Sequence, residues 1–292
     1  MSVADMLTNL TPTPCIVADS VAMRYRVPST EVTEDNRYPH MKFLRLLNPL
    51  PNTVTVNALN EISLVVNRGE SVGVIGRNGS GKSTLMQLIS GQIRPTSGAI
   101  HASSTPIMLG VNAALVPELS GDQNVVLGCL AMGLSHEEIA DRFDEIVEVS
   151  GLEKSIHLPM KSYSSGMGSR LRFAIAACAN PEILLVDEAL NTGDAQFAAR
   201  SKKRMDELRS EAGCVLLVSH SLDTIRQMTT RTIWLDKGDF IMDGPSKDVT
   251  KAYTAFTKHL SKGNNISAAK LRAEAQSSLP MVNLLKTTGS AG

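Results

Sequence analysis

Short, mostly apolar runs alternate along the chain with segments whose apolar residues recur at helical spacing. The apolar runs lie at 71–75, 183–186, 214–218 and 232–235. Amphipathic segments follow three of them, at 84–90, 195–211 and 222–230. A strand that is apolar throughout is buried on both faces, as in a parallel sheet with helices on each side. The pattern therefore predicts an α/β fold around a mostly parallel, doubly covered sheet.

Two regions break this alternation, and the chain ends in a polar segment. Residues 110–165, approximately, show helical patterns with apolar faces of their own, which predicts a helical subdomain inserted between two core strands. Residues 26–57 are rich in Pro, Asn and Thr and contain the basic and apolar piece HMKFLRLLNPL. This piece either contacts a membrane partner or the inner leaflet, or packs on its own domain. We expect the polar tail at 257–292 to be partly disordered.

The composition of the chain mainly argues against certain classes of function. Acidic and basic residues balance at 29 each and aromatic residues make up 4% of the chain, so neither charge nor stacking surface predicts a nucleic-acid partner. No stretch reaches the roughly 18 consecutive apolar residues of a membrane span, and the first residues lack a cationic leader. We therefore expect a soluble chain with no membrane span. The cysteines show no paired metal-ligand spacing and are interpreted as buried thiols of a reducing compartment.

The stretch GRNGSGKST follows the strand at 71–75 and leads into a helix, which is the context that a phosphate-binding loop (P-loop) requires. Its glycines allow backbone N–H groups to turn toward phosphate, and the helix N-terminus adds its positive end. Lys82 would bridge phosphate oxygens as a catalytic residue, and the Ser83 hydroxyl would ligate Mg²⁺. The candidate nucleotide-binding residues of this loop are Gly76, Arg77, Asn78, Gly79, Ser80, Gly81, Lys82, Ser83 and Thr84.

Two carboxylates and a histidine follow two of the other strands. Asp187 stands at the C-terminal end of the run at 183–186, where open α/β sheets place their ligands, and is a candidate Mg²⁺ ligand. Glu188 is a candidate general base for the attacking water. His220 follows the run at 214–218 at the same sheet edge, which predicts a catalytic place near the γ-phosphate. Without the P-loop, the acids could equally belong to a solvated loop and the histidine could be a polar strand cap.

The stretch YSSGM at 163–167 opens a predicted helix with small residues. A helix cap alone would explain this composition. Together with the P-loop, the two acids and the histidine, however, it resembles the signature of the ATP-binding-cassette (ABC) ATPases, a P-loop NTPase fold with an inserted helical subdomain. The resemblance implies that Ser164, Ser165 and Gly166 close over the γ-phosphate bound to a second copy of the chain.

The resemblance covers about residues 14–256, which we expect to form the ATPase domain after a flexible N-terminus at 1–13. Tyr25 resembles the aromatic residue that stacks on adenine in this family. Val111, followed by Asn112, stands where most members have a Mg²⁺-contacting glutamine. Valine cannot ligate a metal, so this sequence departs from the family at that position.

This departure, with YSSGM, DEALNTGDAQF and the long segment after Tyr25, resembles the branch that exports cell-surface glycans such as teichoic acid, capsule, O-antigen or galactan. The resemblance implies an ATPase that uses ATP and Mg²⁺ and forms a homodimer beneath a dimeric integral-membrane permease. Its place would be the cytoplasmic face of the cell membrane. ATP would hold the two subunits together, and hydrolysis would release them.

Three other functions stay open at this stage. A soluble ABC ATPase of DNA repair or translation would usually contain a coiled coil or two cassettes in one chain, and neither pattern occurs here. A GTPase or kinase would share the P-loop without the YSSGM stretch, and the guanine motif Asn-Lys-x-Asp is absent from the sequence. A nucleotide-sensing module without hydrolysis would not need Glu188 and His220.

Overall fold

The computed structural model describes residues 13–28, 53–109, 115–186 and 195–279. Within these residues, six strands form a central sheet in the order β5-β6-β7-β3-β8-β9. Their bounds are β5 Ile107–Leu109, β6 Ile183–Val186, β7 Cys214–Val218, β3 Ser71–Ile75, β8 Arg231–Asp236 and β9 Asp239–Pro245. The first five run parallel, and β9 runs antiparallel to β8. The predicted α/β fold is therefore confirmed, and all four apolar runs are strands of this sheet.

Each face of the central sheet has its own core, because successive side chains of a strand point to opposite faces. Leu185 and Leu216 belong to the core that contains helix α3 (Lys82–Ile89), whereas Leu184 and Leu217 belong to the core on the other face. Among the described residues, five helices contribute buried side chains to that second core: α6 Ser165–Ala177, α7 Ala195–Glu211, α8 Leu222–Met228, α9 Ser246–Ser261 and α10 Asn265–Ser277. The strands are thus fully covered, as their apolar sequences predict.

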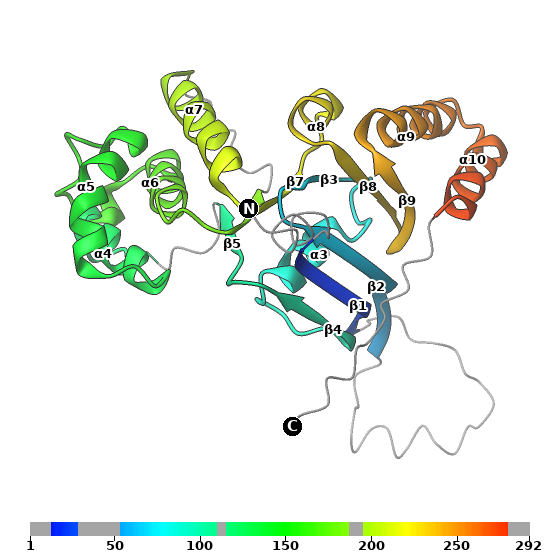
Figure 1. The fold of residues 1–292 in the computed structure, drawn as a ribbon, viewed down its shortest axis with the longest axis horizontal. Coiled ribbons are helices and arrows are strands. Elements are labelled where there is room, and N and C mark those ends of the chain that lie inside the picture. Colours follow the sequence, from blue (N-terminus) through cyan, green and yellow to red (C-terminus); the bar gives the residue numbers. More distant parts are fainter. Residues whose placement is uncertain (1–12, 29–52, 110–114, 187–194, 280–292) are drawn as a thin grey trace, which may run out of the picture.

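A second sheet shares the core of α3. In the described part of the chain it has three antiparallel strands in the order β2-β1-β4, with β1 Pro14–Pro28, β2 Thr53–Asn67 and β4 Ser97–Ala102. Ile16 and Leu64 of this sheet are fully buried in the same cluster as Met86 of α3. Figure 1 shows β1, β2 and β4 beside α3. Both ends of the region at 26–57 are therefore strand, and residues 29–52, with the HMKFLRLLNPL piece, lie outside the described residues.

The helices expected between two core strands are α4 (Gly121–Ala131) and α5 (His136–Ser150), followed by a short 3-10 turn and by α6. They pack around a separate core in which Ile146 and Leu171 are fully buried. The end of α5 is set by Gly151, whose φ of +63° suits glycine. Figure 1 shows α4, α5 and α6 grouped at one end of the molecule.

The described residues past 256 are mostly helical, in contrast to the polar, partly disordered tail that the sequence suggested. Helix α9 continues to Ser261, and α10 (Asn265–Ser277) follows it. The side chain of Ala268 on α10 is buried in the core that α9 also lines. The expected domain end at residue 256 is therefore wrong for these residues. The contacts of α10 with the core are made by alanines, which are small, so the sequence of this segment shows no large apolar residues at helical spacing. Residues 280–292 and 1–12 lie outside the described residues.

The buried contacts of the helical subdomain can be tested by side-chain truncation. Leu171 is fully buried, so Leu171→Ala should lower the free energy of unfolding by about 2–5 kcal/mol through lost apolar burial and the cavity left behind. Urea denaturation followed by circular dichroism measures this change. Ile266→Ala is the control, because Ile266 is 86% exposed, and should change stability by less than about 0.5 kcal/mol. Equal losses in the two variants would contradict the packing described here.

Candidate nucleotide-binding site

The loop from Gly76 to Gly81 connects the C-terminal end of β3 to the N-terminus of α3. Its backbone is left-handed at Gly79, with φ +74°, and at Gly81, with φ +105°. A Cβ at Gly81 would lie 2.7 Å from the carbonyl oxygen of Ala58, and a Cβ at Gly76 would collide with the carbonyl oxygen of Leu235. The loop takes this tight path only because these positions carry no side chain.

Lys82 is the first residue of α3, and its side chain returns to the loop. Its Nζ donates hydrogen bonds to the carbonyl oxygens of Gly76, at 2.8 Å, and Arg77, at 3.0 Å. Only 7% of Lys82 is exposed, and these bonds offset the cost of burying its ammonium group. The charge stands at a helix N-terminus, where backbone N–H groups add positive potential. The arrangement favours an anion with several oxygen acceptors, such as phosphate.

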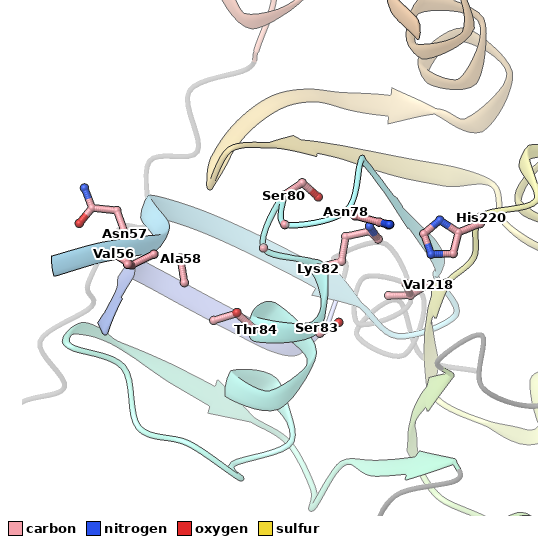
Figure 2. Close-up of a pocket in the computed structure, with 12 residues that line it drawn as sticks. Val56, Asn57, Ala58, Asn78, Ser80, Lys82, Ser83, Thr84, Val218 and His220 are labelled. Carbon is pink, nitrogen blue, oxygen red and sulfur yellow. The ribbon is translucent and has the colours of Figure 1, made fainter. Parts of the chain in front are cut away.

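A pocket of about 470 Å³ opens over this loop, a volume within the roughly 300–1,000 Å³ of small-molecule sites (Figure 2). Residues 78–84 line it from the loop and from the first turn of α3. Residues 56–58 line it from β2, and Val218 and His220 line it from the end of β7. The exposed Ser83 is among the loop residues that face this space. The pocket therefore combines an anion site with polar side chains around it.

Two of the predicted site residues take different places relative to the pocket. His220 lies two residues past the end of β7, and β7 is the parallel neighbour of β3, so His220 reaches the pocket beside the loop. Tyr25 lies on β1 opposite Val56, which lines the pocket. The Tyr25 residue is 38% exposed and is not one of the lining residues. Tyr25 therefore lies on the strand next to the pocket wall that β2 forms.

Four further predicted residues, at 111–112 and 187–188, lie outside the described residues. The strand before the two acids is described, however. Its last residue, Val186, is the register partner of Leu217 in β7. Strand β6 therefore ends at the same edge of the sheet as the strand that leads to His220, which is the edge where the sequence placed Asp187 and Glu188.

The residues of YSSGM lie at the start of α6. Ser164 is the N-cap of this helix, and its Oγ accepts a hydrogen bond from the Met167 backbone N–H at 3.2 Å. Ser164 and Ser165 are exposed, and a Cβ at Gly166 would approach nothing closer than 3.9 Å. None of these three residues lines the pocket over the P-loop of the same chain. The α6 N-terminus is thus exposed and separate from the pocket of its own chain.

The sequence analysis missed the wall that β2 contributes. Residues 56–58 line the pocket, yet they lie at the end of the region at 26–57, to which the sequence analysis assigned no strand. The missed signal is the alternation of Val54 and Val56 with threonines, followed by Ile62 and Leu64 two residues apart. Such a period of two is typical of a half-buried strand.

Comparison with known proteins places this geometry in a family. The sequence model described as ABC transporter matches residues 59–191. A teichoic acids export ATP-binding protein, TagH, of Staphylococcus saprophyticus is 35% identical over 79% of this chain and 87% of its own length. The chain belongs to the ABC transporter family. The ABC transporter protein AbcA of Aeromonas salmonicida is 35% identical over 74% of this ABC protein and 71% of its own length.

Other relatives of this ABC protein are longer. TagH of Lactococcus lactis is 41% identical over 70% of this chain and 44% of its own length. The chain spans less than half the length of the first three such relatives, at 44%, 46% and 40%. Among solved structures, the ATP-binding subunit of an ABC transporter aligns with a TM-score of 0.63 at 22% identity, over 89% of this chain and 99% of its own. At this identity the likeness shows the fold alone.

The backbone of the loop can be tested with a matched pair of glycine substitutions. Both Gly79 and Gly81 have positive φ, but a Cβ at Gly79 has nothing within 4 Å, whereas one at Gly81 meets the Ala58 carbonyl oxygen. Gly81→Ala should therefore lower the free energy of unfolding by about 1–3 kcal/mol more than Gly79→Ala does, because steric overlap adds to backbone strain. Urea denaturation midpoints measure the difference. Equal midpoints would show that the loop is not packed against β2 as described.

Proposed function

We propose that this chain is the ATP-hydrolysing subunit that powers export of a cell-surface polysaccharide of the teichoic acid type through a separate membrane permease. The observation that carries the ATPase part is the pocket over the P-loop, in which a buried lysine, a helix N-terminus and His220 meet. The export part is supported by the names of those relatives whose length this chain mostly covers.

ATP is the nucleotide that fits this proposal, with its phosphates in the loop. Gly79 and Lys82 both line the pocket, and a Cβ at Gly79 would meet nothing within 4 Å, so the loop borders an open cradle. The Ser80 Oγ is buried and has no hydrogen-bond partner among the described residues, which leaves a polar atom beside the cradle. Mg²⁺ would be held by the Ser83 hydroxyl and by Asp187, and when bound it would neutralise phosphate charge.

Hydrolysis is assigned to the sheet edge where β6 and β7 end. Glu188 would take the proton of the attacking water, and His220 would form a hydrogen bond with the γ-phosphate. The place of His220 on the pocket wall supports its part of the assignment. For Glu188, support comes from its sequence position, two residues after Val186, the last residue of β6.

A complete site in this proposal needs two copies of the chain. The exposed N-terminus of α6 carries Ser164 to Gly166, and these residues do not line the pocket of their own chain. In a head-to-tail homodimer, each would cap the γ-phosphate held by the P-loop of the other copy. Dimeric structures of the ATP-binding cassette MJ0796, one of them bound to ADP and Pi, share this fold with TM-scores of 0.60 at 21% identity.

A mixing experiment tests the shared site. Lys82→Ala should abolish phosphate binding, and Ser164→Asp should keep the α6 N-cap while placing a carboxylate against the γ-phosphate of the partner. Neither purified variant should hydrolyse ATP. An equimolar mixture should regain roughly a quarter of the wild-type rate, because about half of random dimers are mixed and each has one intact site. A mixture that stays inactive, or a Ser164→Asp chain with full activity, would contradict the proposal.

The proposed place of work is the cytoplasmic face of the cell membrane, beneath a permease dimer. No helix in the described ranges is long and apolar enough to cross a bilayer. In this proposal a separate membrane protein supplies the transport path. The relatives named for teichoic acid export support a surface glycan of that type as its cargo.

Export can be tested in the organism that carries this chain. Replacement by Lys82→Ala should stop delivery of the surface glycan and cause the lipid-linked polymer to accumulate inside, which extraction and gel analysis of glycolipids measure. Lys270→Ala, on an exposed side chain of α10, should leave export unchanged. A Lys82→Ala strain that has lost ATP turnover but still delivers its glycan would favour a soluble ABC ATPase instead.

A further inference from the structure

The P-loop is hydrogen-bonded to the turn between β8 and β9. The backbone N–H of Gly238 in this turn donates to the carbonyl oxygen of Ser80, at 3.1 Å. The carbonyl oxygen of Gly238 in turn accepts from the Asn60 N–H of β2, at 2.9 Å. Gly238 therefore joins the middle of the P-loop to the strand that forms the pocket wall. Ser80 is only 2% exposed, so water could not replace this hydrogen bond if the turn moved away.

The turn has a backbone that its sequence only partly favours. Both of its central residues are left-handed, with φ +53° at Lys237 and +82° at Gly238. This is the geometry of a tight hairpin turn, which suits glycine but not lysine. The residues on either side, Asp236 and Asp239, are register partners in the β8–β9 ladder. Holding these two carboxylates in place therefore holds the turn.

Arg272 of α10 contacts both carboxylates. Its Nε donates to Asp236 Oδ2 at 2.9 Å, and its Nη2 donates to Asp239 Oδ2 at 2.5 Å and to the Asp236 carbonyl oxygen at 3.3 Å. Asp236 is only 3% exposed, and Asp239 also accepts from Asn60 Nδ2, at 2.5 Å. Burial acts to lower the pKa of the Arg272 guanidinium, but the bonds to Asp239 and Asp236 outweigh it and raise that pKa. The fork of an arginine suits this double contact, which one ammonium group cannot reproduce.

We propose that Arg272 is a positioning residue for nucleotide binding, which holds the β8–β9 turn and, through Gly238, fixes the P-loop backbone at Ser80 in its phosphate-binding shape. The proposal rests on the proposed function, because it assumes that the loop binds ATP. The chain of contacts runs from α10 to Asp236 and Asp239, from the turn to Ser80, and from Ser80 to the pocket. Figure 1 shows α10 next to α9, on the side of β8 and β9.

Coupling of this kind is reciprocal. If the grip of Arg272 favours the binding shape of the loop, then nucleotide in the loop must favour the docked position of α10 by the same factor. Amide hydrogens of α10 should therefore exchange more slowly when MgATP is bound, although α10 contributes no residue to the pocket.

The full-length chain with Arg272→Ala tests the proposal. MgATP binding, measured by calorimetry well below the melting temperature, should weaken about tenfold, as expected for the loss of charge-assisted hydrogen bonds. In steady-state turnover, KM for ATP should rise while kcat stays nearly unchanged, because the chemistry at Glu188 and His220 is untouched. Arg272→Lys keeps the charge, and its affinity for MgATP should lie between those of the wild type and Arg272→Ala. Lys270→Ala, on the same helix with a 78% exposed side chain, should match the wild type.

The second measurement separates positioning from a purely structural role. Hydrogen exchange of α10 should slow with MgATP in the wild type and should not respond in Arg272→Ala. Should Arg272→Ala fail to fold, Asp239→Asn, which keeps side-chain size but removes the charge, carries the same two readouts. A folded variant with lowered melting temperature but wild-type affinity for MgATP overturns the proposed role of Arg272 and leaves the proposed function standing. A wild-type chain that binds no MgATP overturns the proposed function and this proposal with it.

Discussion

The P-loop is a stretch of backbone with little side-chain volume, and its shape depends on the chain around it. Lys82 ties the loop from the helix side through the carbonyl oxygens of Gly76 and Arg77. The Ala58 carbonyl oxygen of β2 leaves no room for a side chain at Gly81, and the Leu235 carbonyl oxygen leaves none at Gly76. A loop confined in this way holds a fixed backbone shape, which an anion site built from backbone N–H groups requires.

The central position of β3 explains why distant segments meet at that loop. Its parallel neighbours are β7 and β8, so the residues that follow each of the three strands emerge at one edge of the sheet. After β7 comes His220, on the pocket wall, and after β8 comes the turn with Gly238, hydrogen-bonded to Ser80. The burial of these strands on both faces therefore fixes the site indirectly, because a shift of any strand would move the segment that follows it.

The central sheet and the P-loop were predictable because their signals are local. Four apolar runs and a glycine-rich loop before a helix are visible within a few residues each. The antiparallel sheet was missed because its strands β1 and β2 flank residues 29–52 and pair across that gap, so their partner is distant in sequence. Helix α10 was missed because its buried contact is made by Ala268, a residue that carries little hydrophobic signal. The role of Arg272 depends on Asp236 and Asp239, some 35 residues away, and only the fold brings them together.

Two helix N-termini, those of α3 and α6, carry the phosphate contacts of the proposed mechanism, and they differ in their surroundings. One helix N-terminus, at α3, is enclosed with Lys82 in the pocket, whereas the other, at Ser164, is exposed and apart from it. Within one chain, the Ser164 Oγ accepts the N-cap bond from the Met167 N–H, and the positive end of α6 stays exposed. In the proposed dimer both helix ends would act on one triphosphate, whose negative charge is concentrated where they meet. Cleavage of the γ-phosphate would then remove the group that the second helix holds, so the two copies would separate because their shared ligand is divided.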